Sequence, residues 1–96
     1  MDLNAFTRSL AGEAPPPGLP GAAAALWWAA KGDWHRAHTV AQDNPDAAGA
    51  WAHAYLHRVE GDLSNAGYWY GRAGKPACTA PLDEEWRAIA AALLAG

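Results

Sequence analysis

The apolar residues of this chain recur at the three- and four-residue spacing of helical faces. Leu3, Phe6 and Leu10 share one face of a segment near the N-terminus, which Asp2 can cap. A second apolar stripe lies near the C-terminus and consists of Trp86, Ile89, Ala90, Leu93 and Leu94. No stretch shows the alternating β-branched pattern of a strand. The pattern therefore predicts an all-α protein.

Glycine, proline and aspartate divide the middle of the chain into four further helices. Gly32-Asp33 and Gly61-Asp62 each place a helix-ending glycine directly before an aspartate that can cap the next helix. Between these two corners, Asn44 can cap a helix whose first turn contains Pro45. The predicted helices cover about residues 20–31, 34–42, 45–60 and 63–73.

The two Gly-Asp corners belong to a repeated pattern of small and aromatic residues. In the second unit, the positions that characterise the pattern are held by Ala54, Gly61, Ala66, Tyr70, Ala73 and Pro76. With Ala25, Trp28 and Ala37 in the first unit, residues 21–76 resemble the tetratricopeptide repeat family. The resemblance implies two antiparallel helical hairpins stacked in a tetratricopeptide-like array. Residues 53–70 are also similar to short bacterial proteins, a similarity that implies no activity.

We expect one domain of about six helices, in which the terminal helices, 1–12 and 81–95, cap the repeat pairs. Residues 13–20 are rich in proline and form a stiff connector. Gly67 and Gly71 lie in the middle of a predicted helix, where each costs about 1 kcal/mol relative to alanine. We expect another backbone to pack against these glycines, with contact to a ligand as the alternative.

Composition and charge exclude several classes of partner. The chain has 96 residues and a net charge of −3, and its seven Lys and Arg residues are scattered, which argues against binding to nucleic acid. Cys78 is the single cysteine, so an internal disulfide is excluded and a reducing compartment is favoured. The longest apolar run, residues 22–30, is too short for a membrane span, and no signal peptide precedes it. The expected location is the cytoplasm.

The four histidines form two pairs, each on one face of a predicted helix. His35 and His38 lie three residues apart, and His53 and His57 lie four apart. If the two helices are antiparallel about a turn near residue 44, His35 and His53 fall at nearly the same height. Up to four imidazoles could then bind Zn²⁺, Ni²⁺ or Cu²⁺. The alternative is a set of structural histidines that bond to backbone or carboxylate groups, with no cofactor.

Aromatic residues are too numerous for one small core, with six tryptophans and three tyrosines in the chain. Part of them can pack between helices, and part can form an exposed patch that binds a peptide or a second copy of the chain. Arg58 and Arg72 can anchor a carboxylate at such a patch, or remain solvated surface charges. The candidate aromatic residues for partner binding are Trp27, Trp28, Tyr55, Tyr68 and Trp69.

No catalytic motif is present, since the chain lacks a Gly-x-Ser-x-Gly elbow, a phosphate-binding glycine loop and a His-Glu-x-x-His pair. The leading hypothesis is therefore a protein–protein interaction module or scaffold, with an unknown protein, a peptide or a second copy as partner. The alternative hypothesis is a metal- or small-ligand-binding protein that uses the histidines.

Overall fold

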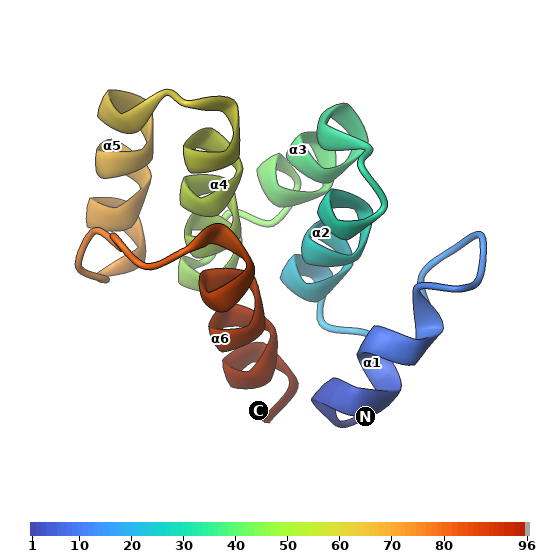
Figure 1. Cartoon of the computed structure of the whole chain (residues 1–96). Helices are drawn as coiled ribbons and strands as arrows, with labels where there is room; N and C mark the ends of the chain where they lie inside the picture. The colour runs from blue at the N-terminus through green and yellow to red at the C-terminus, as the bar shows by residue number, and fades with distance from the viewer. Residues whose placement is uncertain (96) are drawn as a thin grey trace.

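The computed structural model describes residues 1–95 and contains, within that range, six α-helices and no strand (Figure 1). The predictions of an all-α protein and of about six helices are confirmed for these residues. None of these helices combines the length and the apolar content that are needed to cross a bilayer. The helices are α1 (Leu3–Ser9), α2 (Gly21–Ala30), α3 (Trp34–Gln42), α4 (Ala47–Glu60), α5 (Leu63–Ala73) and α6 (Leu82–Ala95).

The two Gly-Asp corners connect α2 to α3 and α4 to α5 as predicted. Gly32 and Gly61 have φ angles of +83° and +86°, in the left-handed region that a residue with a Cβ rarely adopts. The side chain of the following aspartate accepts a hydrogen bond of 3.1 Å from the backbone N–H three residues later, at both corners. Each corner therefore ends one helix and starts the next within a few residues.

The corner between α3 and α4 differs from the prediction. Asp46, and not Asn44, caps α4, because its carboxylate accepts a hydrogen bond of 2.8 Å from the N–H of Gly49. Pro45 precedes the helix, and the Asn44 side chain instead donates to the carbonyl of Val40 at 2.8 Å. The predicted cap was wrong, and α4 begins later in the chain than expected.

The first helix is also shorter than predicted. It ends at Ser9, whereas the predicted helix extended to residue 12. The backbone N–H groups of residues 10–12 each bond to the carbonyl three residues earlier, so the chain leaves the α-helix through a tight final turn.

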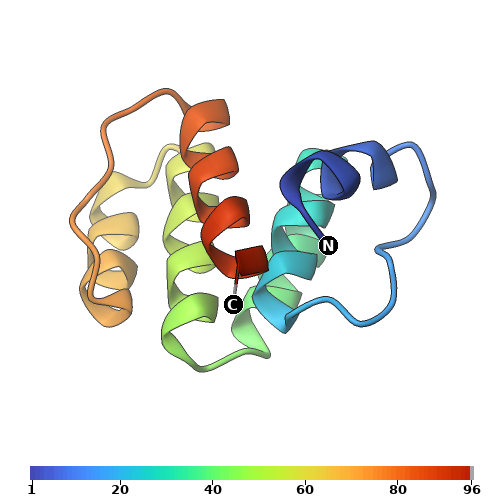
Figure 2. The ribbon, with the colours of Figure 1, turned by 90° about the horizontal axis from the view of Figure 1, so that it is seen from below.

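The helices pack as two pairs, α2 with α3 and α4 with α5, joined by contact between α3 and α4 (Figure 1). Helix α6 lies across α4 and α2 and also contacts α1 (Figure 2). At that junction the Trp86 indole N–H donates to the carbonyl of Leu26 at 2.8 Å, and its ring stacks on Phe6. The side chains that fill the core include Trp27, Phe6, Leu26, Leu56 and Ile89, all fully buried.

The path of α6 leaves the outer face of α5 uncovered. A Cβ atom at Gly67 or Gly71 would meet no heavy atom within 4 Å outside its own helical turn. The prediction that another backbone packs against these glycines was therefore wrong. On the same helix, Leu63 is 69% exposed and Tyr68 is 56% exposed.

Candidate metal centre

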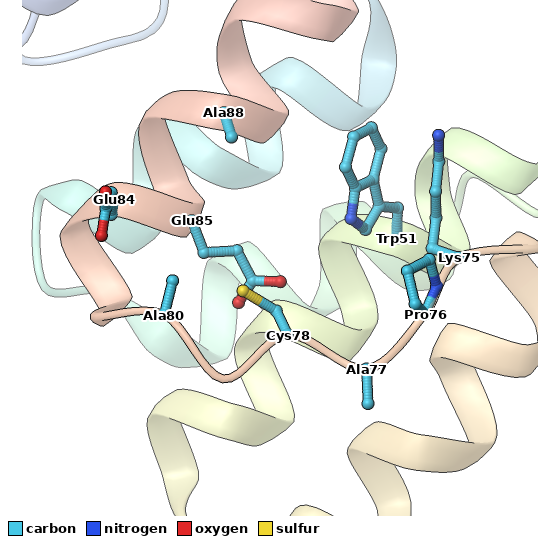
Figure 3. A pocket seen from close by; sticks show the side chains of 9 residues that line it. All are labelled: Trp51, Lys75, Pro76, Ala77, Cys78, Ala80, Glu84, Glu85 and Ala88. Atoms are coloured by element: carbon cyan, nitrogen blue, oxygen red, sulfur yellow. The ribbon is translucent and has the colours of Figure 1, made fainter.

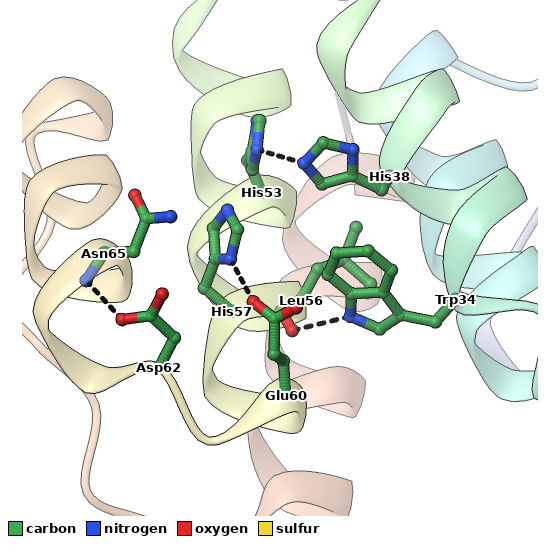
Figure 4. Close-up of polar contacts among 8 residues, drawn as sticks. All are labelled: Trp34, His38, His53, Leu56, His57, Glu60, Asp62 and Asn65. Carbon is green, nitrogen blue, oxygen red and sulfur yellow. Dashed lines mark hydrogen bonds and ion pairs between the residues drawn. The ribbon is translucent and has the colours of Figure 1, made fainter.

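Helices α3 and α4 bring three of the four histidines together. Ligating nitrogens of His38, His53 and His57 all lie within 4.8 Å of one another, and the Nε2 atoms of His38 and His53 are 2.9 Å apart (Figure 4). We call these three residues the histidine cluster. The fourth histidine, His35, is exposed on α3 and lies outside it. The ring of His35 meets the ring of Trp34 edge-on, at 5.6 Å.

The histidines that lie opposite one another on α3 and α4 are not the pair that was expected. The sequence placed His35 opposite His53, whereas the structure places His38 there. The cause is the corner described above, because the cap at Asp46 delays the start of α4 and changes its register against α3. Helical spacing thus identified the histidine pairs, and the geometry of one turn decided which residues meet.

Two tryptophans hold imidazoles of the cluster by ring stacking. The Trp34 ring lies 4.8 Å from that of His38 with an interplanar angle of 17°, and Trp69 lies 3.9 Å from His53 at 9°. The indole N–H of Trp34 also donates to the carbonyl of Leu56 at 2.8 Å, which ties this ring to α4 (Figure 4). These contacts restrict the orientation of His38 and His53.

Glu60 fixes the third imidazole. Its Oε1 lies 2.8 Å from Nδ1 of His57, and the other ring nitrogen points towards His53 (Figure 4). A carboxylate that accepts the Nδ1 proton leaves Nε2 unprotonated and available as a ligand. Sequence analysis missed Glu60, although its position three residues after His57 places both on one helical face.

The environment keeps the imidazoles of His38 and His53 neutral. The pKa of His53 is lowered from 6.5 to about 4, mainly by burial and in part by the neighbouring His38 and His57. The pKa of His38 is also lowered, mainly by burial and then by His57. Metal ions bind imidazole in its neutral form. Binding at these two residues would therefore need no net loss of a proton at neutral pH, although the ring that donates the Nε2–Nε2 hydrogen bond must first move that proton to Nδ1.

The spacing of His38 and His53 is close to that of two ligands on a zinc ion. Two nitrogens on a tetrahedral zinc ion, each at 2.0–2.1 Å, are separated by about 3.3 Å. The observed Nε2 to Nε2 distance of 2.9 Å is shorter by about 0.4 Å, which a small rotation of the rings would supply. Without an ion, this contact is a hydrogen bond in which one ring donates and the other accepts.

A small hollow of about 90 Å³ lies beside His53. Residues at the α3–α4 corner form one side, and Trp69 and Arg72 from α5 form the other. A hollow of this size can hold water molecules or a small ion beside His53.

Two of the residues predicted for partner binding are buried, and a third, Arg58, is half-buried in an ion pair. Trp27 is fully buried and donates from its indole N–H to Ser9 Oγ at 3.1 Å. Tyr55 is buried as well. Arg58 donates from Nη1 to Glu85 Oε1 at 2.6 Å, which raises the pKa of the guanidinium. The indole of Trp27 and the guanidinium of Arg58 therefore form hydrogen bonds within the molecule.

The other four residues predicted for partner binding reach the surface. Trp28 is half-buried on α2, and the guanidinium of Arg36 lies 4.3 Å above its ring. Tyr68, Trp69 and Arg72 lie together on α5, where Arg72 Nη1 donates to the Tyr68 hydroxyl at 2.9 Å. Only this last group forms a shared surface.

Glu85 is a buried carboxylate at the edge of a second cavity (Figure 3). Besides the Arg58 guanidinium it binds the Tyr70 hydroxyl, whose pKa is raised by burial and by this hydrogen bond. Glu85 was not among the predicted site residues, although its position four residues before Ile89 places both on one helical face. The cavity has a volume of about 400 Å³ and is lined by Trp51, Lys75, Pro76, Ala77, Cys78, Ala80, Glu84, Glu85 and Ala88.

Comparisons with protein-family models, with curated proteins and with solved structures found no match for this chain.

Proposed function

We propose that the protein binds a divalent transition metal ion, with zinc as the best match, through the histidine cluster. The observation that carries the proposal is the convergence of three imidazole nitrogens, from two helices, within 4.8 Å of one another. Imidazole suits Zn²⁺, Cu²⁺ and Ni²⁺, whereas Mg²⁺ and Ca²⁺ prefer oxygen ligands.

The surroundings of the cluster support this proposal. Histidines that bind metals usually donate their second ring N–H to a carboxylate or carbonyl, as His57 does to Glu60. The stacked rings of Trp34 and Trp69 restrict the remaining two imidazoles before any ion arrives. An arrangement that is already ordered loses less conformational entropy on binding.

The direct test uses untagged protein that has been treated with EDTA and dialysed. Titration calorimetry with ZnCl₂ should give one zinc ion per chain, and thermal unfolding should shift to higher temperature. At a free zinc concentration of 100 times Kd, the expected stabilisation is about 2.7 kcal/mol. MgCl₂ at the same concentration should produce no shift.

Two histidine variants provide matched controls. His53→Ala should abolish stoichiometric binding, whereas His35→Ala, on an exposed residue outside the cluster, should retain it. If His53→Ala fails to fold, His38→Ala tests the same claim at a half-buried position. Wild-type protein that binds no zinc, or that binds it equally well after loss of His38, would refute the proposal.

We also propose a role as an interaction module, built from two tetratricopeptide-like helix pairs. The specific support is the exposed surface of α5, where Tyr68 lies beside Arg72 and Leu63 is exposed in the first turn. Large apolar side chains exposed on a helix are a common feature of protein interfaces.

The interaction proposal is tested by pull-down from native cell extracts, with the wild-type protein and the Tyr68→Asp variant as the two baits. The wild-type protein should capture a stoichiometric partner, or a second copy of itself, and the Tyr68→Asp variant should not. Sedimentation of the pure protein over a range of concentrations separates self-association from binding to another chain. Identical recovery with both baits and a monomer at all concentrations would refute this role.

A further inference from the structure

We propose that a metal ion in the histidine cluster keeps a fourth coordination position that is open to a small anion from solvent. This inference rests on the proposed metal-binding function. It names the class of ligand that the centre would accept.

The structure supplies three ligands to such an ion and no fourth. Among residues 1–95, the group of close ligand atoms that contains His38 consists of three imidazoles alone. His35 is exposed and its ring packs against the edge of Trp34. Glu60 is engaged at Nδ1 of His57, on the opposite side of the ring from the nitrogen that faces the cluster (Figure 4). Zinc sites with three protein ligands typically hold water or substrate in the fourth position.

The burial of the three rings is unequal. His53 and His57 are only 4% and 5% exposed, whereas His38 is half-buried. Solvent therefore reaches the cluster from the side of His38. Access along one side favours a ligand of a few atoms over a bulky one.

The charge balance favours an anion. Three neutral imidazoles leave the full charge of a divalent ion uncompensated. The carboxylate of Glu60 lies behind His57 and is occupied by its hydrogen bond. A small anion at the open position would compensate the positive charge of the metal ion at close range.

Cobalt provides the test, because its visible absorption depends on the number and type of its ligands. The EDTA-treated, dialysed protein is loaded with Co²⁺ and titrated with sodium azide, with sodium perchlorate as a weakly coordinating control. We expect azide to change the cobalt spectrum in a saturable manner, with the metal still bound after gel filtration, and perchlorate to leave it unchanged. His35→Ala should show the same starting spectrum and the same response.

The outcomes separate this inference from the function on which it rests. Failure of Co²⁺ and Zn²⁺ to bind would refute the metal-binding function itself. If cobalt binds and azide leaves its spectrum unchanged, only the open coordination position is refuted. A changed starting spectrum in His35→Ala would show that His35 occupies the fourth position, which also overturns the inference.

Discussion

Replacement of Glu85 by alanine should destabilise the fold more than most single substitutions. The Glu85 side chain is 3% exposed and ion-paired to Arg58, whose side chain is 14% exposed. It also accepts the hydrogen bond of the buried Tyr70 hydroxyl. Glu85→Ala would leave a mostly buried guanidinium and a buried phenol without their shared partner.

The magnitude follows from the cost of an uncompensated buried charge. Removal of one member of a buried ion pair typically costs about 3–5 kcal/mol. Arg58 keeps its second hydrogen bond, from Nη2 to the carbonyl of Ala80 at 2.6 Å, and is partly accessible to solvent. We therefore expect the lower end of the range, about 3 kcal/mol. A domain of this size typically has a free energy of unfolding of about 5–15 kcal/mol.

Urea unfolding at pH 7, followed by tryptophan fluorescence, measures this loss. Glu84→Ala is the matched control, because Glu84 is the exposed neighbour in the same helical turn and its loss should change stability by less than about 0.5 kcal/mol. The dependence of the unfolding free energy on urea should stay unchanged between the variants, so that the midpoints report stability.

A double variant, Tyr70→Phe with Glu85→Ala, checks the origin of the effect. If the phenol depends on the carboxylate, the two losses should not add. A loss below about 1 kcal/mol for Glu85→Ala, or one equal to that of Glu84→Ala, would refute the reasoning.

Three further predictions concern glycines and pH. Gly67→Ala should raise the free energy of unfolding by about 0.5–1 kcal/mol in urea titrations, because the added methyl group meets no other atom; a loss would mean that the face is covered. Gly49→Ala should instead lower stability in the same titration, because its Cβ would lie 1.7 Å from the Asn44 carbonyl oxygen, and an unchanged midpoint would contradict this packing. In EDTA, stability should fall as the pH drops from 6.5 towards 4, because the unfolded chain then binds a proton that folded His53 does not. The expected loss between pH 7 and pH 5 is about 2 kcal/mol, and equal stability at both would argue against a buried neutral His53.

The sequence by itself determined where most helices begin and end. The corners at Gly32-Asp33 and Gly61-Asp62 form as predicted, because a left-handed glycine and a capping aspartate act through contacts within a few residues. The helical spacing of His53 and His57 was likewise sufficient to place both on one face of α4. These features depend on backbone conformation and on contacts within a few residues, so the local sequence is sufficient to determine them.

Only the tertiary structure decided which residues meet across helices. His38, and not His35, lies opposite His53 because the cap at Asp46 sets the register of α4 against α3. The burial of Glu85 and the exposure of Gly67 both follow from the path of α6, which crosses α4 and α2 and leaves α5 open. These contacts join residues that are distant in sequence. Which of these residues meet depends on how whole helices pack. The sequence pattern of any one segment determines only part of that packing.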